Sequence, residues 1–179
     1  MNPSSVHRHV PRQKPSGHAP PTALYTAEER RRRDASRWTL VQGILAPLQF
    51  LVFLISLALV IRTLLTGEGA TAATVSVIAK TGILYAIMIT GAIWEHDVFG
   101  RYLFAPAFFW EDVVSMAVMA LHTAYVLCVV FGWGSVEQQM VLALAAYAAY
   151  VINAAQFLIK FRQARRAPPP DAAPLGAAS

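Results

Sequence analysis

Long apolar runs, separated by short polar segments, dominate the middle of the sequence. Four runs can be delimited: residues 38–61, 70–94, 113–131 and 140–159. A helix rises 1.5 Å per residue, so each run is long enough to cross the roughly 30 Å hydrocarbon layer of a bilayer. Lys80 is the only Lys, Arg, Asp or Glu within them. The pattern predicts an all-α integral membrane protein whose four-helix domain covers residues 38–159.

Composition agrees with a membrane protein and excludes an ordinary soluble domain. Hydrophobic residues make up 56% of the chain and charged residues only 14%, whereas soluble globular chains carry about 25% charged residues. The one cysteine, Cys128, lies in the third run. A single cysteine excludes an intrachain disulfide, and the sequence predicts no metal site.

The distribution of cationic residues predicts the orientation. Residues 1–37 carry eight Lys or Arg, residues 160–179 carry four, and the loop between the second and third runs carries Arg101. The other two loops carry only Arg62. Since cytoplasmic loops are enriched in Lys and Arg, we expect both termini and the loop 95–112 in the cytoplasm. The N-terminal segment 1–37 is predicted to be basic and largely disordered, with the disorder in residues 1–22, and the C-terminal segment 160–179 to be basic and then a disordered Pro/Ala-rich tail from Ala167 on. The run Arg30–Arg33 is interpreted as a topology determinant rather than a nucleic-acid site.

Polar residues inside the first two spans have packing interpretations. Gln42, Gln49 and Ser56 recur every seven residues and therefore share a helix face, which favours hydrogen bonds to a neighbouring helix. For Lys80 two alternatives stand: its stem extends to the membrane surface, or its ammonium has a buried role.

The third span carries a polar stripe. At 100° per residue, Glu111, Ser115, His122 and Tyr125 fall on one face, while Asp112 lies about 100° away. His122 has three interpretations: a hydrogen-bonded packing residue, a proton relay, or an axial ligand to a metal-containing pigment. No second histidine lies in a span, so haem held by two histidines is not expected.

The segment 94–112 is the most unusual stretch. Seven of its 19 residues are aromatic and four are carboxylates. An interfacial aromatic belt accounts for its Trp and Tyr, but not for so many Phe beside acidic groups. Flat apolar walls with carboxyl groups at the rim suit a large planar amphipathic ligand whose edge needs proton transfer. The alternative for the carboxylates is solvation at the interface with pairing to Arg101.

In this segment and in parts of the spans, the sequence resembles a known family, the 3-vinyl bacteriochlorophyllide hydratases. The resemblance covers about residues 25–162 and rests on six stretches: Trp94–Glu95, Val98–Gly100, Leu103–Val113, Leu121–Tyr125, Trp38–Pro47 and Tyr147–Phe157. It implies a hydro-lyase of bacteriochlorophyll biosynthesis in a bacterial inner membrane, cytoplasmic or intracytoplasmic. Such an enzyme converts the 3-vinyl group of a chlorophyllide-type tetrapyrrole to a 3-(1-hydroxyethyl) group. No cofactor is implied beyond the magnesium that the substrate carries, and other pigment-biosynthesis enzymes are possible partners. His96 and Asp97 depart from the family pattern, so no role is assigned to them.

Hydration of a vinyl group requires an acid that protonates the terminal carbon and water that traps the cation. A normal Glu has a pKa of about 4.3, and desolvation or a neighbouring carboxylate raises it. We expect Glu111 to be the acid, because it shares a face with Ser115 and His122. Glu95 is expected to be the base if the two helix ends meet, and Asp112 is a third catalytic candidate or a helix-capping residue. The predicted substrate-binding residues are His122, Ser115, Tyr125, Phe104, Phe108, Phe109 and Trp110.

Two other function classes fit parts of the sequence. A pigment-binding or assembly factor without catalysis would use the same aromatic surface, with His122 as a magnesium ligand. A small transporter would use polar groups near the midplane, namely Lys80, His122, Gln42 and Asn153. Transporters of this kind are commonly built from inverted repeats, and none is recognisable in the sequence.

Overall fold

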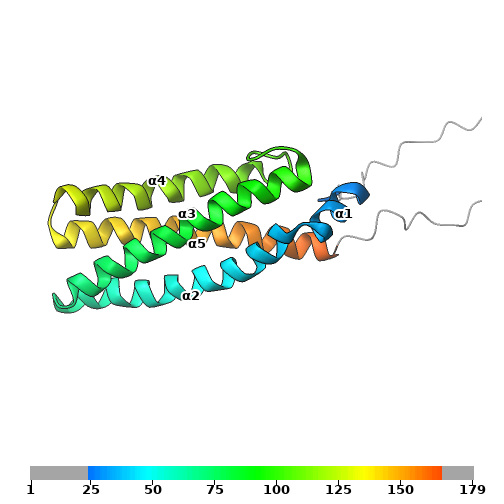
Figure 1. Cartoon of the computed structure of the whole chain (residues 1–179). Coiled ribbons are helices and arrows are strands. Elements are labelled where there is room, and N and C mark those ends of the chain that lie inside the picture. The colour runs from blue at the N-terminus through cyan, green and yellow to red at the C-terminus, as the bar shows by residue number, and fades with distance from the viewer. Residues whose placement is uncertain (1–23, 167–179) are drawn as a thin grey trace, which may run out of the picture.

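The computed structural model describes residues 24–166, and all of its regular structure is helical (Figure 1). A short helix α1 (Ala27–Ala35) precedes four long ones. These are α2 (Arg37–Thr66), α3 (Ala70–Phe99), α4 (Phe109–Phe131) and α5 (Val136–Arg166). All four long helices are apolar enough to cross a membrane. The predicted all-α fold with four spans is therefore confirmed.

The long helices form two hairpins, α2 with α3 and α4 with α5, joined by residues 100–108. Gly67 and Gly132 end α2 and α4 in the left-handed conformation, with φ of 72° and 66°, which allows the chain to turn back at once. Helix α3 runs obliquely, so that it lies beside α2 at one end of the bundle and beside α4 at the other (Figure 1). We call the end that holds α1, residues 100–108 and the last turns of α5 the α1 end.

The long helices extend past the apolar runs. Helix α3 has 30 residues and is therefore about 45 Å long, against a hydrocarbon layer of roughly 30 Å. The predicted loop 95–112 is accordingly too long: α3 continues to Phe99 and α4 begins at Phe109. Acidic residues end a membrane span without ending a helix, which is why hydropathy misplaced these boundaries.

Helix α1 is an ordered element within the predicted N-terminal segment 1–37, and hydropathy gave no sign of it. Thr26 and Glu29 form a reciprocal capping box at its start. Tyr25 stacks on Phe99, with ring centroids 5.9 Å apart, and the Ser36 hydroxyl donates to Asp97 at 2.8 Å. These contacts fix the helix to the end of α3. The rest of the two predicted tails, residues 1–23 and 167–179, lies outside the described residues.

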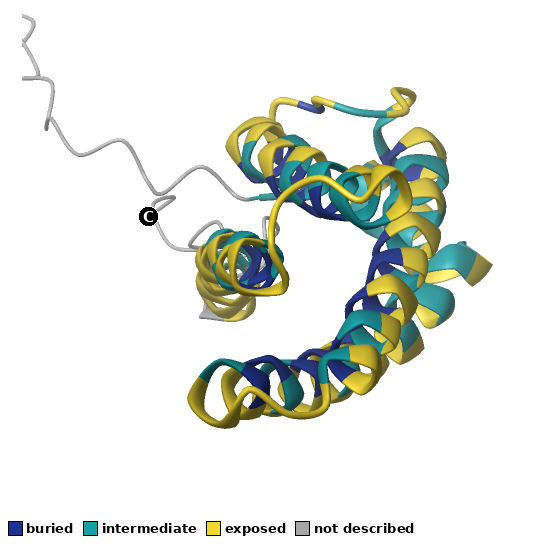
Figure 2. Cartoon of the chain, turned by 90° about the vertical axis from the view of Figure 1, so that its left-hand side faces the viewer, coloured by how far each residue is buried: buried dark blue, intermediate teal, exposed yellow. Residues whose placement is uncertain are grey.

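Buried side chains line the inner faces of the four long helices, and the outer faces are exposed (Figure 2). The interior is polar in places, as expected where helices associate through hydrogen bonds within lipid. Ser56 bonds to Tyr147 at 2.5 Å, and Gln42 donates to Thr90 at 2.7 Å. Lys80 is fully buried, which decides between its two predicted alternatives in favour of a buried role.

Candidate active site

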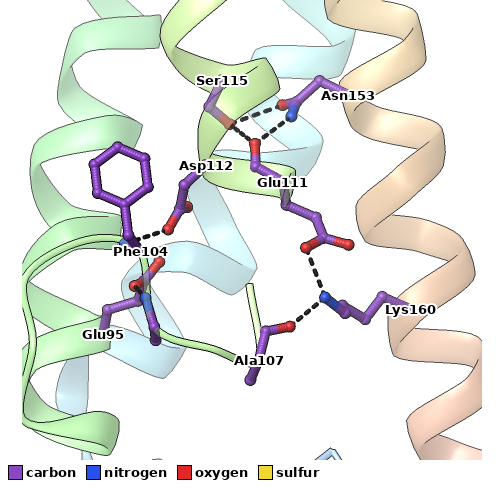
Figure 3. Close-up of polar contacts among 9 residues, drawn as sticks. Glu95, Phe104, Ala107, Glu111, Asp112, Ser115, Asn153 and Lys160 are labelled. Atoms are coloured by element: carbon purple, nitrogen blue, oxygen red, sulfur yellow. Dashed lines mark hydrogen bonds and ion pairs between the residues drawn. The ribbon is translucent and has the colours of Figure 1, made fainter. Parts of the chain in front are cut away.

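Three acidic side chains gather at the α1 end, where α3 finishes and α4 begins. Glu95, Glu111 and Asp112 are labelled in Figure 3. They are 5%, 7% and 4% exposed, so all three are withdrawn from solvent. Residues 100–108 connect the two helices, and backbone N–H groups of this connection bond to both Glu95 and Asp112. The helix ends that carry Glu95 and Asp112 therefore meet. The catalytic role expected for Glu95 required this proximity.

Glu95 and Asp112 form a carboxyl pair whose side chains interact directly. Two consecutive backbone N–H groups of the loop hold the pair. Phe104 donates to Asp112 Oδ2 at 2.7 Å, and Ala105 donates to Glu95 Oε2 at 3.3 Å. The Asp112 bond is the shorter of the two, so Asp112 is better stabilised as a carboxylate than Glu95.

Phe104 adopts an unusual backbone conformation. Its φ of 59° places it in the left-handed region, where it is the only residue other than glycine in the described part of the chain. Such a conformation costs about 1–3 kcal/mol and persists only where surrounding contacts enforce it. Here the strained turn directs the Phe104 and Ala105 N–H groups toward the two carboxyls, so the strain is a feature of the site.

The carboxyl pair lies beyond the apolar runs 70–94 and 113–131, next to the exposed residues His96 and Asp97. Burial first, and the neighbouring Asp112 second, raise the pKa of Glu95 above its ordinary value. Burial also raises the pKa of Asp112, against the opposing effect of the Phe104 N–H. Two buried carboxyls in contact disfavour double ionisation, so the pair retains a proton more readily than an exposed carboxyl does.

Glu111 has a different environment, because it is held by α5. Its Oε2 lies 2.6 Å from Lys160 Nζ, and Lys160 also donates to the Ala107 carbonyl. The amide of Asn153 donates to the Glu111 carbonyl at 2.9 Å, and the Ser115 hydroxyl donates to the same oxygen at 2.8 Å (Figure 3). Glu111 is therefore an ion-paired carboxylate that is fixed at both side chain and backbone.

An exposed aromatic surface lies beside the carboxyl pair. Phe104, Phe109 and Trp110, which we call the aromatic surface, are 39%, 43% and 68% exposed. Their neighbouring ring centroids are 5.8 Å and 5.4 Å apart. Phe108 was predicted to bind substrate with them, but it is fully buried and stacks on Phe157. Three of the four aromatic residues predicted to bind substrate therefore belong to the aromatic surface.

The polar stripe of α4 is present, and it extends away from the site. Ser115, His122 and Tyr125 are buried on the face that also carries Glu111. His122 lies about 16 Å from Glu111 along the helix. Its Nδ1 faces the Val118 carbonyl at 2.8 Å and its Nε2 faces Lys80 Nζ at 3.1 Å, so both ring nitrogens are engaged. The structure brings Ser115 to the acidic cluster but places His122 and Tyr125 deep in the bundle.

Several contributors to the site were not predicted. Lys160 was counted only as a topology charge, and Asn153 was named only among the midplane polar groups of a transporter. Their spacing of seven puts them on one face of α5, and this was the available signal. The N–H donors of Phe104 and Ala105 depend on loop geometry, which has no sequence signature. Among the described residues, no group of three His, Cys, Asp or Glu side chains is placed to hold a metal ion.

Comparison with known proteins identifies the family. The family model of 2-vinyl bacteriochlorophyllide hydratase (BCHF) matches residues 25–163. The chain belongs to this family. Over 143 residues it is 67% identical to a 2-vinyl bacteriochlorophyllide hydratase of Rhodobacter capsulatus, covering 80% of this chain and 83% of that protein. It is 66% identical over 153 residues to a protein of the same name from Cereibacter sphaeroides, covering 86% of this chain and 95% of that protein. No solved structure matches it. The matched residues of this family member include the whole acidic cluster and the aromatic surface.

Proposed function

We propose that this protein adds water across the vinyl group of a chlorophyllide-type tetrapyrrole and forms a 1-hydroxyethyl group. Its membership of the hydratase family supports the reaction. The names of the relatives refer to a 2-vinyl group. We take it to be the same group as the 3-vinyl group of the family resemblance, because numbering schemes for the macrocycle differ. The observation that carries the proposal is a buried carboxyl pair directly beside an exposed aromatic surface.

The carboxyl pair supplies the proton. The π electrons of the vinyl group form a C–H bond at the terminal carbon, and the positive charge is left on the carbon attached to the macrocycle, which delocalises it. We assign the proton to Glu95, because the shorter N–H bond stabilises Asp112 as the carboxylate. An acid used near neutral pH needs a raised pKa, and the environment of Glu95 provides one.

Water then attacks the cation, forming the C–O bond and releasing one proton. We assign Glu111 as the acceptor of that proton, because an ion-paired carboxylate is a base and not an acid. This reverses the roles that the sequence favoured for Glu111 and Glu95. Proton return to Glu95 closes the cycle. The net reaction is addition of water without oxidation or reduction, so it requires no redox cofactor.

The aromatic surface is the proposed platform for the macrocycle. Flat exposed rings at the edge of the bundle offer a stacking partner to a planar ligand that arrives from the membrane. The central magnesium and the vinyl group of one macrocycle are much closer together than the 16 Å between Glu111 and His122. We therefore assign His122, Tyr125 and Phe108 to packing, and Ser115 to positioning Glu111.

We also propose that the α1 end faces the cytoplasm of a bacterial cell, in the inner or intracytoplasmic membrane. Helix α1, residues 100–108 and the end of α5 all lie at this end (Figure 1). The segments that lead to it carry nearly all of the Lys and Arg outside the spans, as a cytoplasmic side requires. The active site then opens at the cytoplasmic surface, where neighbouring pathway enzymes have access to it.

The test is direct. Membranes from a host without the pathway, with and without the expressed chain, are supplied with chlorophyllide a. A product heavier by one water, with the blue-shifted absorption of a macrocycle that has lost vinyl conjugation, is expected only when the chain is present. Pigment that binds to the folded protein but is recovered unchanged, for chlorophyllide a and for other vinyl macrocycles, would contradict the proposal and favour a pigment-binding factor.

A further inference from the structure

Lys160 makes several contacts with the interior of the protein, which a residue that only determines membrane orientation does not need. Its ammonium pairs with Glu111 Oε2 at 2.6 Å and donates to the Ala107 carbonyl. The same nitrogen lies 5.0 Å from the centroid of the buried Phe108 ring. The Lys160 side chain is only 24% exposed. By contrast, Arg162 and Arg165, on the same helix, are exposed.

These contacts join three parts of the site. Glu111 belongs to the first turn of α4, Ala107 belongs to the loop that holds the carboxyl pair, and Lys160 itself lies near the end of α5. Two turns earlier on the same face of α5, Asn153 holds the Glu111 backbone carbonyl. Helix α5 thus fixes the side chain of Glu111 through one residue and its backbone through another.

We propose that Lys160 is a positioning residue of the hydration reaction. Its ammonium holds the Glu111 carboxylate in place as the proton acceptor, and its bond to Ala107 holds residues 100–108 against α5. Lys160 does not touch the substrate and therefore acts through Glu111. This inference rests on the proposed function, because Glu111 has an acceptor role only if water is added.

The test uses the full-length chain in membranes, with kcat and KM measured on chlorophyllide a. Lys160→Met removes the ammonium, and Lys160→Arg keeps a cation in its place. Arg162→Met is the matched control, because it removes one positive charge from an exposed position two residues after Lys160. Glu111→Gln and the double variant Glu111→Gln/Lys160→Met complete a cycle that measures the coupling of the two side chains.

We expect Lys160→Met to lower kcat about 10-fold or more while KM changes less than about threefold, because a misplaced base slows chemistry and not binding. Lys160→Arg is expected to retain more activity than Lys160→Met, and Arg162→Met to match the wild type. Lys160→Met is expected to cause no further loss in the Glu111→Gln background. If Lys160→Met does not assemble, Lys160→Gln takes its place with the same expectations.

Three results would overturn the inference: an unchanged kcat in Lys160→Met, an increase in KM alone, or losses that add in the double variant. An increase in KM alone would instead make Lys160 a substrate-binding cation. A wild-type chain that forms no hydrated product contradicts the proposed function itself. An active wild type with an unaffected Lys160→Met variant contradicts only the role of Lys160.

Discussion

The carboxyl groups of Glu95 and Asp112 are adjacent, yet their surroundings favour different protonation states. Both are buried, but Asp112 accepts the shorter hydrogen bond from the loop backbone. Unequal stabilisation of two neighbouring carboxyls is a general way to obtain a proton donor near neutral pH. Glu111, which precedes Asp112 in the sequence, is paired with a cation instead. In the proposed mechanism, this one acidic cluster provides both the proton donor and the proton acceptor.

The pH dependence of turnover tests this assignment at the residue scale. Glu95 must be protonated to act, so kcat falls as pH rises through its raised pKa. Asp112→Asn removes the negative neighbour, which lowers the pKa of Glu95 toward its ordinary value. The alkaline limb of the kcat profile should therefore move to lower pH in this variant. An unmoved limb, or one moved to higher pH, would show that Asp112 does not control the donor.

The sequence pointed to the three acidic residues of the candidate site but not to the groups that they contact. Glu95, Glu111 and Asp112 were candidates because they flank an aromatic segment, where desolvation and neighbouring carboxylates raise the pKa of an acid. Glu95 and Asp112 come together because the end of α3 lies beside the start of α4. A pattern along the chain does not show that these two helix ends are neighbours. The contact between Lys160 and Glu111 joins residues 49 positions apart. For such contacts the decisive information lies in the packing of α5 against α4.

At the scale of elements, residues 100–108 determine the geometry of the site. They connect two helices and supply both backbone donors, through a turn that forces Phe104 into the left-handed region. Hydropathy predicted the four long helices correctly because lipid imposes apolar runs of defined length. It misplaced their ends and did not detect α1, whose stability derives from a capping box and from packing on α3.

Substitutions at Phe104 separate the conformation of the turn from the ring. Asn tolerates the left-handed region, so Phe104→Asn should keep kcat within about threefold and raise KM, because only the aromatic platform is reduced. Phe104→Val places a β-branched residue there, for which the left-handed region is a rare and strained conformation, and should lower kcat as well. Steady-state kinetics on membranes with equal protein content provide the comparison. Equal kcat values for the two variants would mean that the strained turn does not position the carboxyl pair.

At the scale of the whole molecule, the bundle has two separate polar regions. The acidic cluster lies at the α1 end, and a second group around Lys80 and His122 lies deep between the helices. Lys80 Nζ lies 4.1 Å from the Tyr150 ring centroid and within hydrogen-bond distance of His122. Along α3, Lys80 and Glu95 are separated by about 22 Å. On the proposed mechanism, this distance assigns the deep group to the scaffold and not to the chemistry.

A substitution in the deep group tests that separation. His122→Gln keeps a hydrogen-bonding side chain. Because substitutions at distant positions have independent effects, this change should not alter the acidic cluster. We expect kcat and KM for chlorophyllide a within about threefold of the wild type, and an unchanged absorption spectrum of the bound pigment. Loss of pigment binding, or a spectral shift of the bound macrocycle, would make His122 a ligand of the substrate magnesium.

The central claim is that Glu95 provides the proton that starts hydration, and one comparison tests it most directly. Membranes holding the wild type, Glu95→Gln or Asp97→Asn are incubated with chlorophyllide a in ¹⁸O-labelled water. Asp97 serves as the control because it is an exposed carboxylate two residues from Glu95. We predict a labelled product, heavier by one water, from the wild type and Asp97→Asn, and a rate at least about 100-fold lower from folded, pigment-binding Glu95→Gln. Equal rates of labelled product from Glu95→Gln and the wild type would contradict the account.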